Sequence, residues 1–181
     1  MRVYIENVSR PADWLRELEL RIVEGFVEHA RQRRLTKMAR AITRAGNGGL
    51  YVAAAAILLA TPLRYGRSLA AAALSLGVAF LVYPPLKRFV ARPRPCHAAG
   101  RLADILHPLD HHSFPSGHAM TAAAFGVPIA VAAPHGALLV IAGCAAMSWS
   151  RMALGHHYLS DVVAGTLLGA TIAAAVALLV L

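Results

Sequence analysis

Charged residues are scarce in this sequence. They make up 15% of the 181 residues, against about a quarter in typical soluble domains, whereas hydrophobic residues make up 57%. Five stretches contain no Asp, Glu, Lys or Arg, and most approach the roughly 20 apolar residues that a membrane-spanning helix needs. These stretches are 45–63, 68–86, 114–134, 136–150 and 162–181. The sequence therefore predicts an all-α polytopic membrane bundle with about five transmembrane helices.

Acidic residues are rarer than basic ones, with 9 Asp and Glu against 18 Lys and Arg and a formal net charge of +9. In a soluble protein such an excess of positive charge would suggest a nucleic-acid partner. Here ten of the cations lie in residues 1–47 and five in 87–101, next to apolar segments. This distribution suits contact with anionic lipid headgroups, so we expect the bilayer, and no nucleic acid, as a partner.

Cysteines number only two, Cys96 and Cys144, and their separation is not that of metal ligands. The sequence also lacks a linker-like stretch, so we expect a single membrane domain over residues 1–181. Within this domain we distinguish an amphipathic N-terminal segment, residues 1–44, from a transmembrane core, residues 45–181.

The N-terminal segment carries apolar residues every three to four positions from Pro11 to about Arg44, which is the period of an amphipathic helix. This helix either lies in the membrane interface or packs at the edge of the domain. With five crossings, the polar loops 87–113 and 151–161 face the same side of the membrane as the N-terminal segment. The excess of Lys and Arg on that side favours the cytoplasm, with the periplasmic face as the alternative.

Two polar stretches border the predicted spans. KRFVARPRP places Lys87 and Arg94 seven residues apart, so a continuous helix would present both on one side until the prolines end it. Taken alone, this cluster also fits interfacial anchors. SFPSGHAM opens an apolar helix with Ser116, Gly117 and His118, and the free N–H groups of a helix N-terminus bind anions. The same turn also fits an ordinary helix cap.

A third polar stretch, SRMALGHHYLSD, combines a cation with histidine and a carboxylate. Arg151 offers a planar fork of donors that suits phosphate oxygens. His157 and Asp161 are four residues apart, so on a helix the carboxylate can accept from one imidazole nitrogen and leave the other as a nucleophile. A pair at this spacing is often structural, but ionisable groups near a membrane are costly and tend to be functional.

Together the three stretches resemble the signature of the type 2 phosphatidic acid phosphatase superfamily. The matching positions are Lys87, six residues, Arg94-Pro95; Pro115-Ser116-Gly117-His118; and Ser150-Arg151, five residues, His157, three residues, Asp161. The resemblance covers residues 87–161 and leaves out the first 44 residues, and members of the family often have six spans rather than five. It implies an integral membrane enzyme of small bacterial type, in the inner (plasma) membrane.

The resemblance also implies a lipid phosphate phosphatase that uses no metal or other cofactor. His157 would attack phosphorus and form a phosphohistidine, Asp161 would fix its tautomer, and His118 would protonate the leaving oxygen and activate water. The phosphoryl oxygens would bind to Lys87, Arg94, Ser116, the Gly117 amide and Arg151. Phosphatidic acid, phosphatidylglycerol phosphate, polyprenyl diphosphates such as undecaprenyl diphosphate, and lipid A phosphates are the implied substrates. The sequence chooses neither among them nor among oligomeric states.

Three other hypotheses deserve comparison. A metal site is one, because several histidines crowd the region of the motifs together with Asp110, although the nearby Arg and Lys would repel a divalent ion. These histidines are His97, His107, His111, His112 and His156. A vanadium haloperoxidase shares the site architecture, but those relatives are large and soluble. A non-catalytic lipid-binding protein of the same fold would have no reason to keep both histidines, Asp161 and the cations.

Overall fold

The computed structural model describes residues 11–60, 65–98, 108 and 110–181. The elements are α1 (Pro11–Gln32), α2 (Thr36–Ala45), α3 (Gly49–Ala60), α4 (Gly66–Val90), α5 (Pro95–Ala98), α6 (Gly117–Ala132), the 3-10 helix η1 (Pro134–Gly136), α7 (Ala137–Ala153) and α8 (Leu159–Val180). In this part of the chain an isolated bridge between Pro93 and His112 is the only β-pairing. The predicted all-α class is therefore confirmed for the residues that the structure describes.

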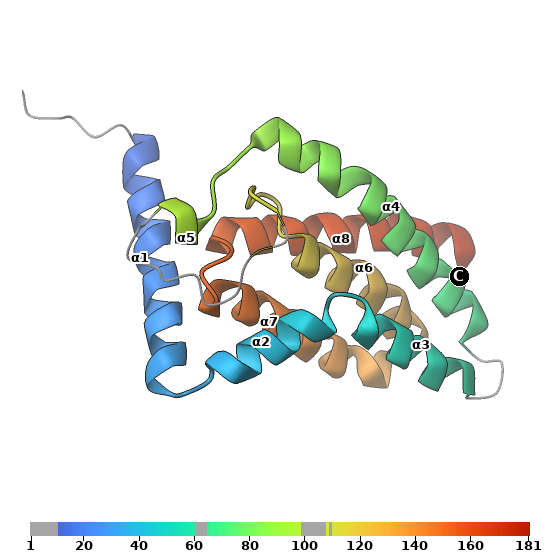
Figure 1. The fold of residues 1–181 in the computed structure, drawn as a ribbon. Coiled ribbons are helices and arrows are strands. Elements are labelled where there is room, and N and C mark those ends of the chain that lie inside the picture. The colour runs from blue at the N-terminus through green and yellow to red at the C-terminus, as the bar shows by residue number, and fades with distance from the viewer. Residues whose placement is uncertain (1–10, 61–64, 99–107, 109) are drawn as a thin grey trace, which may run out of the picture.

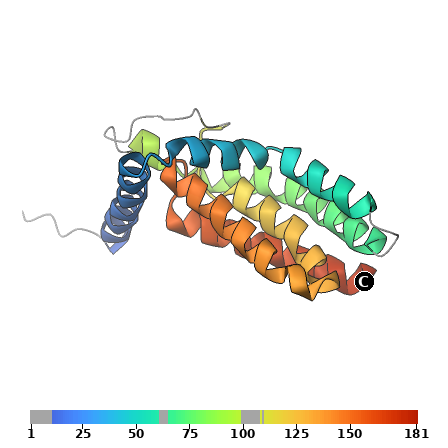
Figure 2. The same ribbon diagram turned by 90° about the horizontal axis from the view of Figure 1, so that it is seen from below.

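Helix α6 occupies the middle of the bundle and packs against α4, α7 and α8 (Figure 1). Most of its buried positions are small: Ala119, Met120, Thr121, Ala123, Ala124, Gly126 and Pro128. Small side chains let neighbouring helices come close, which is how helices associate in lipid. α1 lies across one end of the bundle, and α2 and α3 run along one of its sides (Figures 1 and 2).

The contact between α6 and α8 depends on two glycines of α8. A Cβ added at Gly165 would lie 2.4 Å from the carbonyl oxygen of Ser116, and one added at Gly169 would lie 2.1 Å from that of Met120. Both distances are too short for any side chain, and both partners are backbone atoms. Because the two glycines have no side chain, the first turns of α6 pack directly against the backbone of α8. This contact places the SFPSGHAM segment beside the start of α8.

The long helices have the length and the surface of membrane spans. α4, the segment Pro134–Ala153 and α8 are long and apolar enough to cross a membrane, and α2 with α3 counts as a fourth span if the bent pair is taken as one. Apolar α6 has 16 residues and is shorter. Large side chains such as Leu138, Leu139 and Leu178 point outward and are exposed. An outer surface of this kind suits lipid rather than water, and the count of five spans stays a prediction.

The N-terminal part differs from the sequence prediction in where its helices break. The expected helix from Pro11 to Arg44 is interrupted at residues 33–35, where Arg34 has a left-handed φ of 55°. The expected first span, 45–63, is also wrong at its start, because α2 ends at Ala45 and α3 begins at Gly49 after a 60° bend. The glycines around this bend remove the steric penalty for leaving the helical path. The bend carries Asn47, which contacts His118.

Candidate active site

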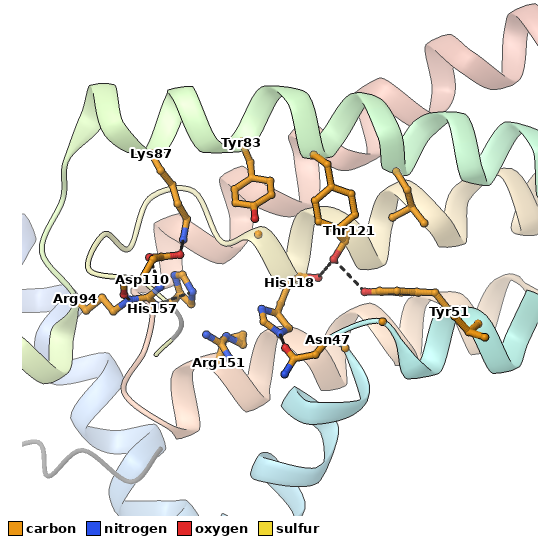
Figure 3. Close-up of a pocket in the computed structure, with 16 residues that line it drawn as sticks. Asn47, Tyr51, Tyr83, Lys87, Arg94, Asp110, His118, Thr121, Arg151 and His157 are labelled. Carbon is orange, nitrogen blue, oxygen red and sulfur yellow. Dashed lines mark hydrogen bonds and ion pairs between the residues drawn. The ribbon is translucent and has the colours of Figure 1, made fainter. Parts of the chain in front are cut away.

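The three polar stretches of the sequence meet at one cavity of about 390 Å³ (Figure 3). Six of the predicted site residues line it: Lys87, Arg94, Gly117, His118, Arg151 and His157. The other two, Ser116 and Asp161, are fully buried next to lining residues. Segments that are far apart in the sequence thus contribute to a single site, and none of the eight predicted residues lies elsewhere.

His157 lies in the connection between α7 and α8 and is buried. The sequence analysis placed it on a helix with Asp161, and this is wrong, because α8 begins only at Leu159. The pair forms instead across the helix start, with His157 Nδ1 3.5 Å from Asp161 Oδ2. Asp161 lies in the first turn of α8, where its Oδ2 also accepts the Tyr158 N–H at 2.9 Å. Capping of α8 therefore fixes the carboxylate that faces the imidazole.

The two ring nitrogens of His157 differ in their surroundings, because Nε2 contacts Arg94 whereas Nδ1 faces Asp161 without a hydrogen bond among the described residues. Arg94 Nη1 lies 3.1 Å from His157 Nε2, and since a guanidinium can only donate, Nε2 accepts and Nδ1 carries the ring proton. Burial lowers the pKa of His157 well below its usual value, and the positive charges of Arg151, Arg94 and Lys87 lower it further. The imidazole is therefore neutral at neutral pH, with its basic lone pair on Nε2.

Three buried cations surround this imidazole, each held by a different element. Lys87 lies in the last turn of α4, Arg94 just before α5, and Arg151 near the end of α7. The expected continuous helix through Lys87 and Arg94 is not formed, because α4 ends at Val90 and Ala91 takes a left-handed φ of 49°. The chain then turns back and brings Arg94 to the same cavity as Lys87.

Asp110 pairs with two of these cations. Its Oδ2 lies 2.6 Å from Lys87 Nζ and its Oδ1 lies 2.6 Å from Arg94 Nη2. Burial alone would raise the pKa of Asp110, but hydrogen bonds and charges from Lys87 and Arg94 outweigh this effect and lower it. The carboxylate is therefore ionised and neutralises part of the positive charge of the site.

The start of α6 also borders the cavity, next to the three cations. Ser116 caps the helix, and its own N–H donates to the Asp161 carbonyl at 3.0 Å. Its Oγ is buried and has no hydrogen-bond partner among the described residues, and the same is true of Arg151 Nε. The N–H groups of a first helical turn have no partner within the helix. Unpaired donors of this kind, next to buried cations, suit an oxyanion.

His118 lies in the first turn of α6, as the sequence predicts, and its ring contacts the α2–α3 bend. Its Nε2 lies 2.8 Å from Asn47 Oδ1. With Oδ1 as the acceptor, Nε2 carries a proton. Figure 3 shows the His118 ring between Asn47 and the cationic end of the cavity. A residue outside the signature thus orients the ring.

The far end of the cavity is apolar and aromatic. It is lined by side chains of α3 and α4, namely Tyr51, Val52, Leu76, Phe80 and Tyr83. Val52 is 71% exposed and Phe80 is 55% exposed, so this end reaches the outer surface of the bundle. The cavity therefore runs from a cationic end, inside the bundle, to an apolar end on the surface that faces lipid.

The metal hypothesis gains no support from the described histidines. In the described ranges, no three His, Cys, Asp or Glu side chains stand close enough to hold a metal ion. His97 and His111 have ring centroids 6.4 Å apart, whereas His107 lies outside the described residues. Asp110, which the sequence analysis considered as a ligand, is bound by Lys87 and Arg94 instead.

Four residues with contacts in or beside the site were missed, or named for another role, in the sequence analysis. They are Glu19, Asn47, Arg92 and Asp110. Arg92 donates to Asp161 Oδ1 at 2.8 Å and pairs with Glu19 of α1. The Gly-Asn-Gly-Gly stretch signalled a turn around Asn47, but no local pattern indicated the partners of the other three.

A comparison with protein families matches the same region of the chain. The sequence model of the PAP2 superfamily matches residues 68–181. This range contains all three polar stretches, α5 to α8 and all but the first two residues of α4, and it leaves out α1, α2 and α3. Asn47 and Glu19 therefore belong to the part of the chain that lies outside the match.

Two curated relatives are similar over part of the chain. A lipid A 1-phosphatase from Rhizobium johnstonii is 37% identical over 89 residues, which are 47% of this chain and 36% of that protein. A decaprenylphosphoryl-5-phosphoribose phosphatase from Mycobacterium tuberculosis is 42% identical over 101 residues, which are 55% of this chain and 54% of that protein. The chain thus matches about half or less of the length of these relatives.

A solved structure is similar over nearly the whole chain. It is a transmembrane PAP2 type phosphatidylglycerolphosphate phosphatase from Bacillus subtilis, with a TM-score of 0.73 and 24% identity. The match covers 93% of this chain and 86% of that chain. At this level of identity the likeness concerns the fold.

Proposed function

The chain belongs to the PAP2 superfamily, and from this premise we propose that it is an integral membrane phosphatase that hydrolyses a lipid phosphomonoester or diphosphate. The observation that carries the proposal is the neutral, buried imidazole of His157, which lies among three buried cations in one cavity. The basic nitrogen of a neutral imidazole can act as a nucleophile. The cations around it can bind a phosphate group and stabilise its negative charge while the nitrogen attacks.

The reaction proceeds through a phosphohistidine. The Nε2 lone pair of His157 attacks phosphorus, so that a P–N bond forms while the P–O bond to the lipid breaks. Water then attacks the phosphohistidine, the P–N bond breaks, and inorganic phosphate leaves. Asp161 faces Nδ1 and stabilises the positive charge that the ring acquires on phosphorylation.

His118 handles the protons of both steps. The negative charge of an arriving phosphate favours the protonated form of His118, which then donates its proton to the departing lipid oxygen. The neutral ring that results accepts a proton from the attacking water. Asn47 holds the ring from the other side and keeps it directed at the cavity. General acid–base catalysis of this kind typically contributes about 10²–10⁴-fold.

The cations and the start of α6 bind the phosphoryl oxygens. Lys87, Arg94 and Arg151 supply the charge, and Ser116 Oγ and the Gly117 amide add donors at the helix N-terminus. Phosphoryl transfer depends mainly on positioning and on stabilisation of charge. Cationic side chains therefore take the role that a metal ion has in other phosphatases, and the proposed reaction needs no cofactor.

The apolar end of the cavity makes a lipid the preferred substrate. A phosphorylated headgroup at the cationic end would leave its chain between α3 and α4, against Val52 and Phe80, which reach the outer surface. The lipid then never leaves the bilayer. The two curated relatives are named for phosphatases of lipid A and of a decaprenyl-linked sugar phosphate. These names support a phosphate on a large lipid, and we carry this class over to the chain.

The site is proposed to face the cytoplasm at the inner membrane. α1 belongs to the same end of the bundle as the site, because Ser160 N, at the start of α8, donates to Glu19 Oε1 at 3.0 Å. The many cations of the N-terminal segment favour the cytoplasmic side. Labelling of Arg34→Cys with a membrane-impermeant thiol reagent tests this, in a background that lacks Cys96 and Cys144. Labelling of intact cells would place the site outside.

Phosphate release from a panel of purified lipid phosphates tests the function. The full chain in mixed micelles should release phosphate from at least one phosphomonoester or diphosphate in the panel, and a strong chelator should leave the rate unchanged. His157→Ala should abolish the release, whereas His135→Ala, at an exposed position of η1, should not. A purified wild-type protein that releases phosphate only after a divalent metal is added would disprove the mechanism.

A further inference from the structure

We propose that the Asp110 carboxylate competes with the substrate's phosphate for Lys87 and Arg94, and so acts as an internal stand-in for phosphate between turnovers. The inference rests on the proposed function, in which these two cations bind the phosphoryl group. It assigns to Asp110 a specific role, which is to set how tightly substrate and product phosphate bind. Asp110 lies outside the residues of the signature.

The contacts of Asp110 are those that two phosphate oxygens would make. Oδ2 lies 2.6 Å from Lys87 Nζ, and Oδ1 lies 2.6 Å from Arg94 Nη2. Both cations line the cavity that also holds His157. A carboxylate and a phosphate compete for such donors because each offers two anionic oxygens at similar spacing. With Asp110 in place, the two cations are already occupied.

Arg94 shows how complete this occupation is. Its Nε donates to the Asp110 carbonyl at 2.8 Å, and its Nη1 contacts the His156 carbonyl at 2.8 Å and His157 Nε2 at 3.1 Å. With the bond from Nη2 to Asp110, four of the five N–H groups of the guanidinium have partners. A phosphate can therefore gain a bidentate contact with Arg94 only by displacing one of them.

The same contacts cover the nucleophile. The Nε2 lone pair of His157 accepts from Arg94, so it is not available for attack while Arg94 stays in this position. An arriving phosphate that takes Nη2 from Asp110 draws the guanidinium toward itself. When phosphate replaces the carboxylate on Arg94, the guanidinium therefore also releases the lone pair of His157. The nucleophile becomes available only when substrate is bound.

Exposure shows which partner of the ion pairs can move. The Asp110 side chain is 40% exposed, whereas those of Lys87 and Arg94 are 8% and 1% exposed. A carboxylate near the surface regains hydration when it swings outward, so its displacement costs little, whereas a buried cation has no such alternative. The cations stay in the cavity, and Asp110 is the group that yields to phosphate.

Product release follows from the same competition. After hydrolysis, inorganic phosphate lies between the cations, and the return of Asp110 to Lys87 and Arg94 displaces it. The carboxylate therefore weakens the binding of phosphate and speeds its departure. A site without Asp110 would lack the carboxylate that pairs with Lys87 and Arg94, and it would bind its product more tightly.

The test compares inhibition of the full-length chain by inorganic phosphate and by vanadate. Asp110→Asn keeps the shape of the side chain but removes its charge, and it should lower both inhibition constants at least about tenfold, the usual effect of one hydrogen bond to a charged group. Glu17→Gln is the matched control, because Glu17 is exposed and pairs with Arg21 on the surface of α1, and it should leave both constants unchanged. Unchanged or weaker inhibition of Asp110→Asn would overturn the proposal.

A second measurement uses the wild-type protein and does not depend on how a variant folds. The His112 N–H donates to Asp110 Oδ1 at 3.2 Å and so reports on the position of the carboxylate. Hydrogen exchange at this amide should accelerate when phosphate or vanadate binds, while the start of α6 becomes more protected. Slower exchange at His112 would show that Asp110 stays in place. If neither anion binds the wild-type protein, the proposed function fails together with this inference.

Discussion

Arg92 and Asp161 form an ion pair, with Nη1 2.8 Å from Oδ1, at the first turn of α8. The other carboxylate oxygen faces His157 and caps the helix. Arg92 also pairs with Glu19 of α1, and its guanidinium lies 3.9 Å from the centre of the Tyr158 ring. The N-terminal helix, which the family match leaves out, is thereby connected to the carboxylate behind the proposed nucleophile.

Removal of Arg92 should impair both stability and activity. Asp161 has no exposed side-chain surface, so Arg92→Gln leaves a buried carboxylate without its ion-pair partner and should lower the free energy of unfolding by about 1–3 kcal/mol. It should also lower kcat/KM on the proposed lipid substrate, because Asp161 faces His157 and is proposed to support it in the reaction. Arg88→Gln, at an exposed position in the last turn of α4, is the control. Thermal unfolding and initial rates measure both effects, and equal behaviour of the two variants would contradict the prediction.

Gly165→Ala should displace the start of α6. The added Cβ would meet the Ser116 carbonyl at 2.4 Å, and backbone cannot yield as a flexible side chain can. Overpacking of this kind costs about 1–3 kcal/mol, and here the strain falls on Ser116 at the start of α6, beside the proposed phosphate site. Gly77→Ala in α4 is the matched control, because nothing lies within 4 Å of its new Cβ. Thermal unfolding should separate the two variants, and equal stability would contradict the close approach of α8 to Ser116.

The polar residues that line the cavity could be predicted from sequence as one candidate site, because the spacing within each polar stretch is local. Lys87, His118 and His157 each belong to a short stretch whose residue types already indicate phosphate chemistry. Their convergence on one cavity followed from the order of apolar segments, which places both polar loops at one membrane face. The described helices agree with this arrangement, because each polar stretch lies at a helix end.

The partners of those residues could not be predicted in the same way. Asp110 and Arg92 are held by contacts with residues 16 to 73 positions away, and such contacts depend on how helices pack rather than on any periodic pattern. The spacing of four between His157 and Asp161 suggested a helix, but the helix begins between them. The glycines before Leu50 could have indicated a turn where a continuous span was predicted, but not that this turn would bring Asn47 to His118.

The low pKa of His157 predicts how the stability of the folded chain depends on pH. Burial and neighbouring cations hold its pKa well below the usual value of about 6.5. Below that pH the unfolded chain takes up a proton that the folded chain does not, so the folded state loses stability as the pH falls. His157→Gln removes this contribution. Between pH 7.5 and 5, the unfolding temperature of the wild type should therefore fall more steeply than that of the variant, and parallel curves would contradict a depressed pKa.

His118 and His157 should respond differently to the leaving group. A lipid alkoxide is a poor leaving group and needs a proton, whereas nitrophenolate leaves without one. In single-turnover experiments, His118→Ala should lose far more activity on a lipid phosphomonoester than on nitrophenyl phosphate. His157→Ala should lose activity on both substrates alike. If His118→Ala slows the two substrates equally, the acid role belongs to another residue.

The most direct test is to trap the phosphoenzyme. The purified chain is mixed with a ³²P-labelled lipid phosphate, quenched in alkali within milliseconds to seconds, digested, and analysed for the labelled residue. Label that resists alkali, is lost in acid and maps to His157 is the predicted result, and His157→Ala should carry none. Wild-type protein that turns over the lipid at full rate without label on His157 at any time point would contradict the phosphohistidine mechanism.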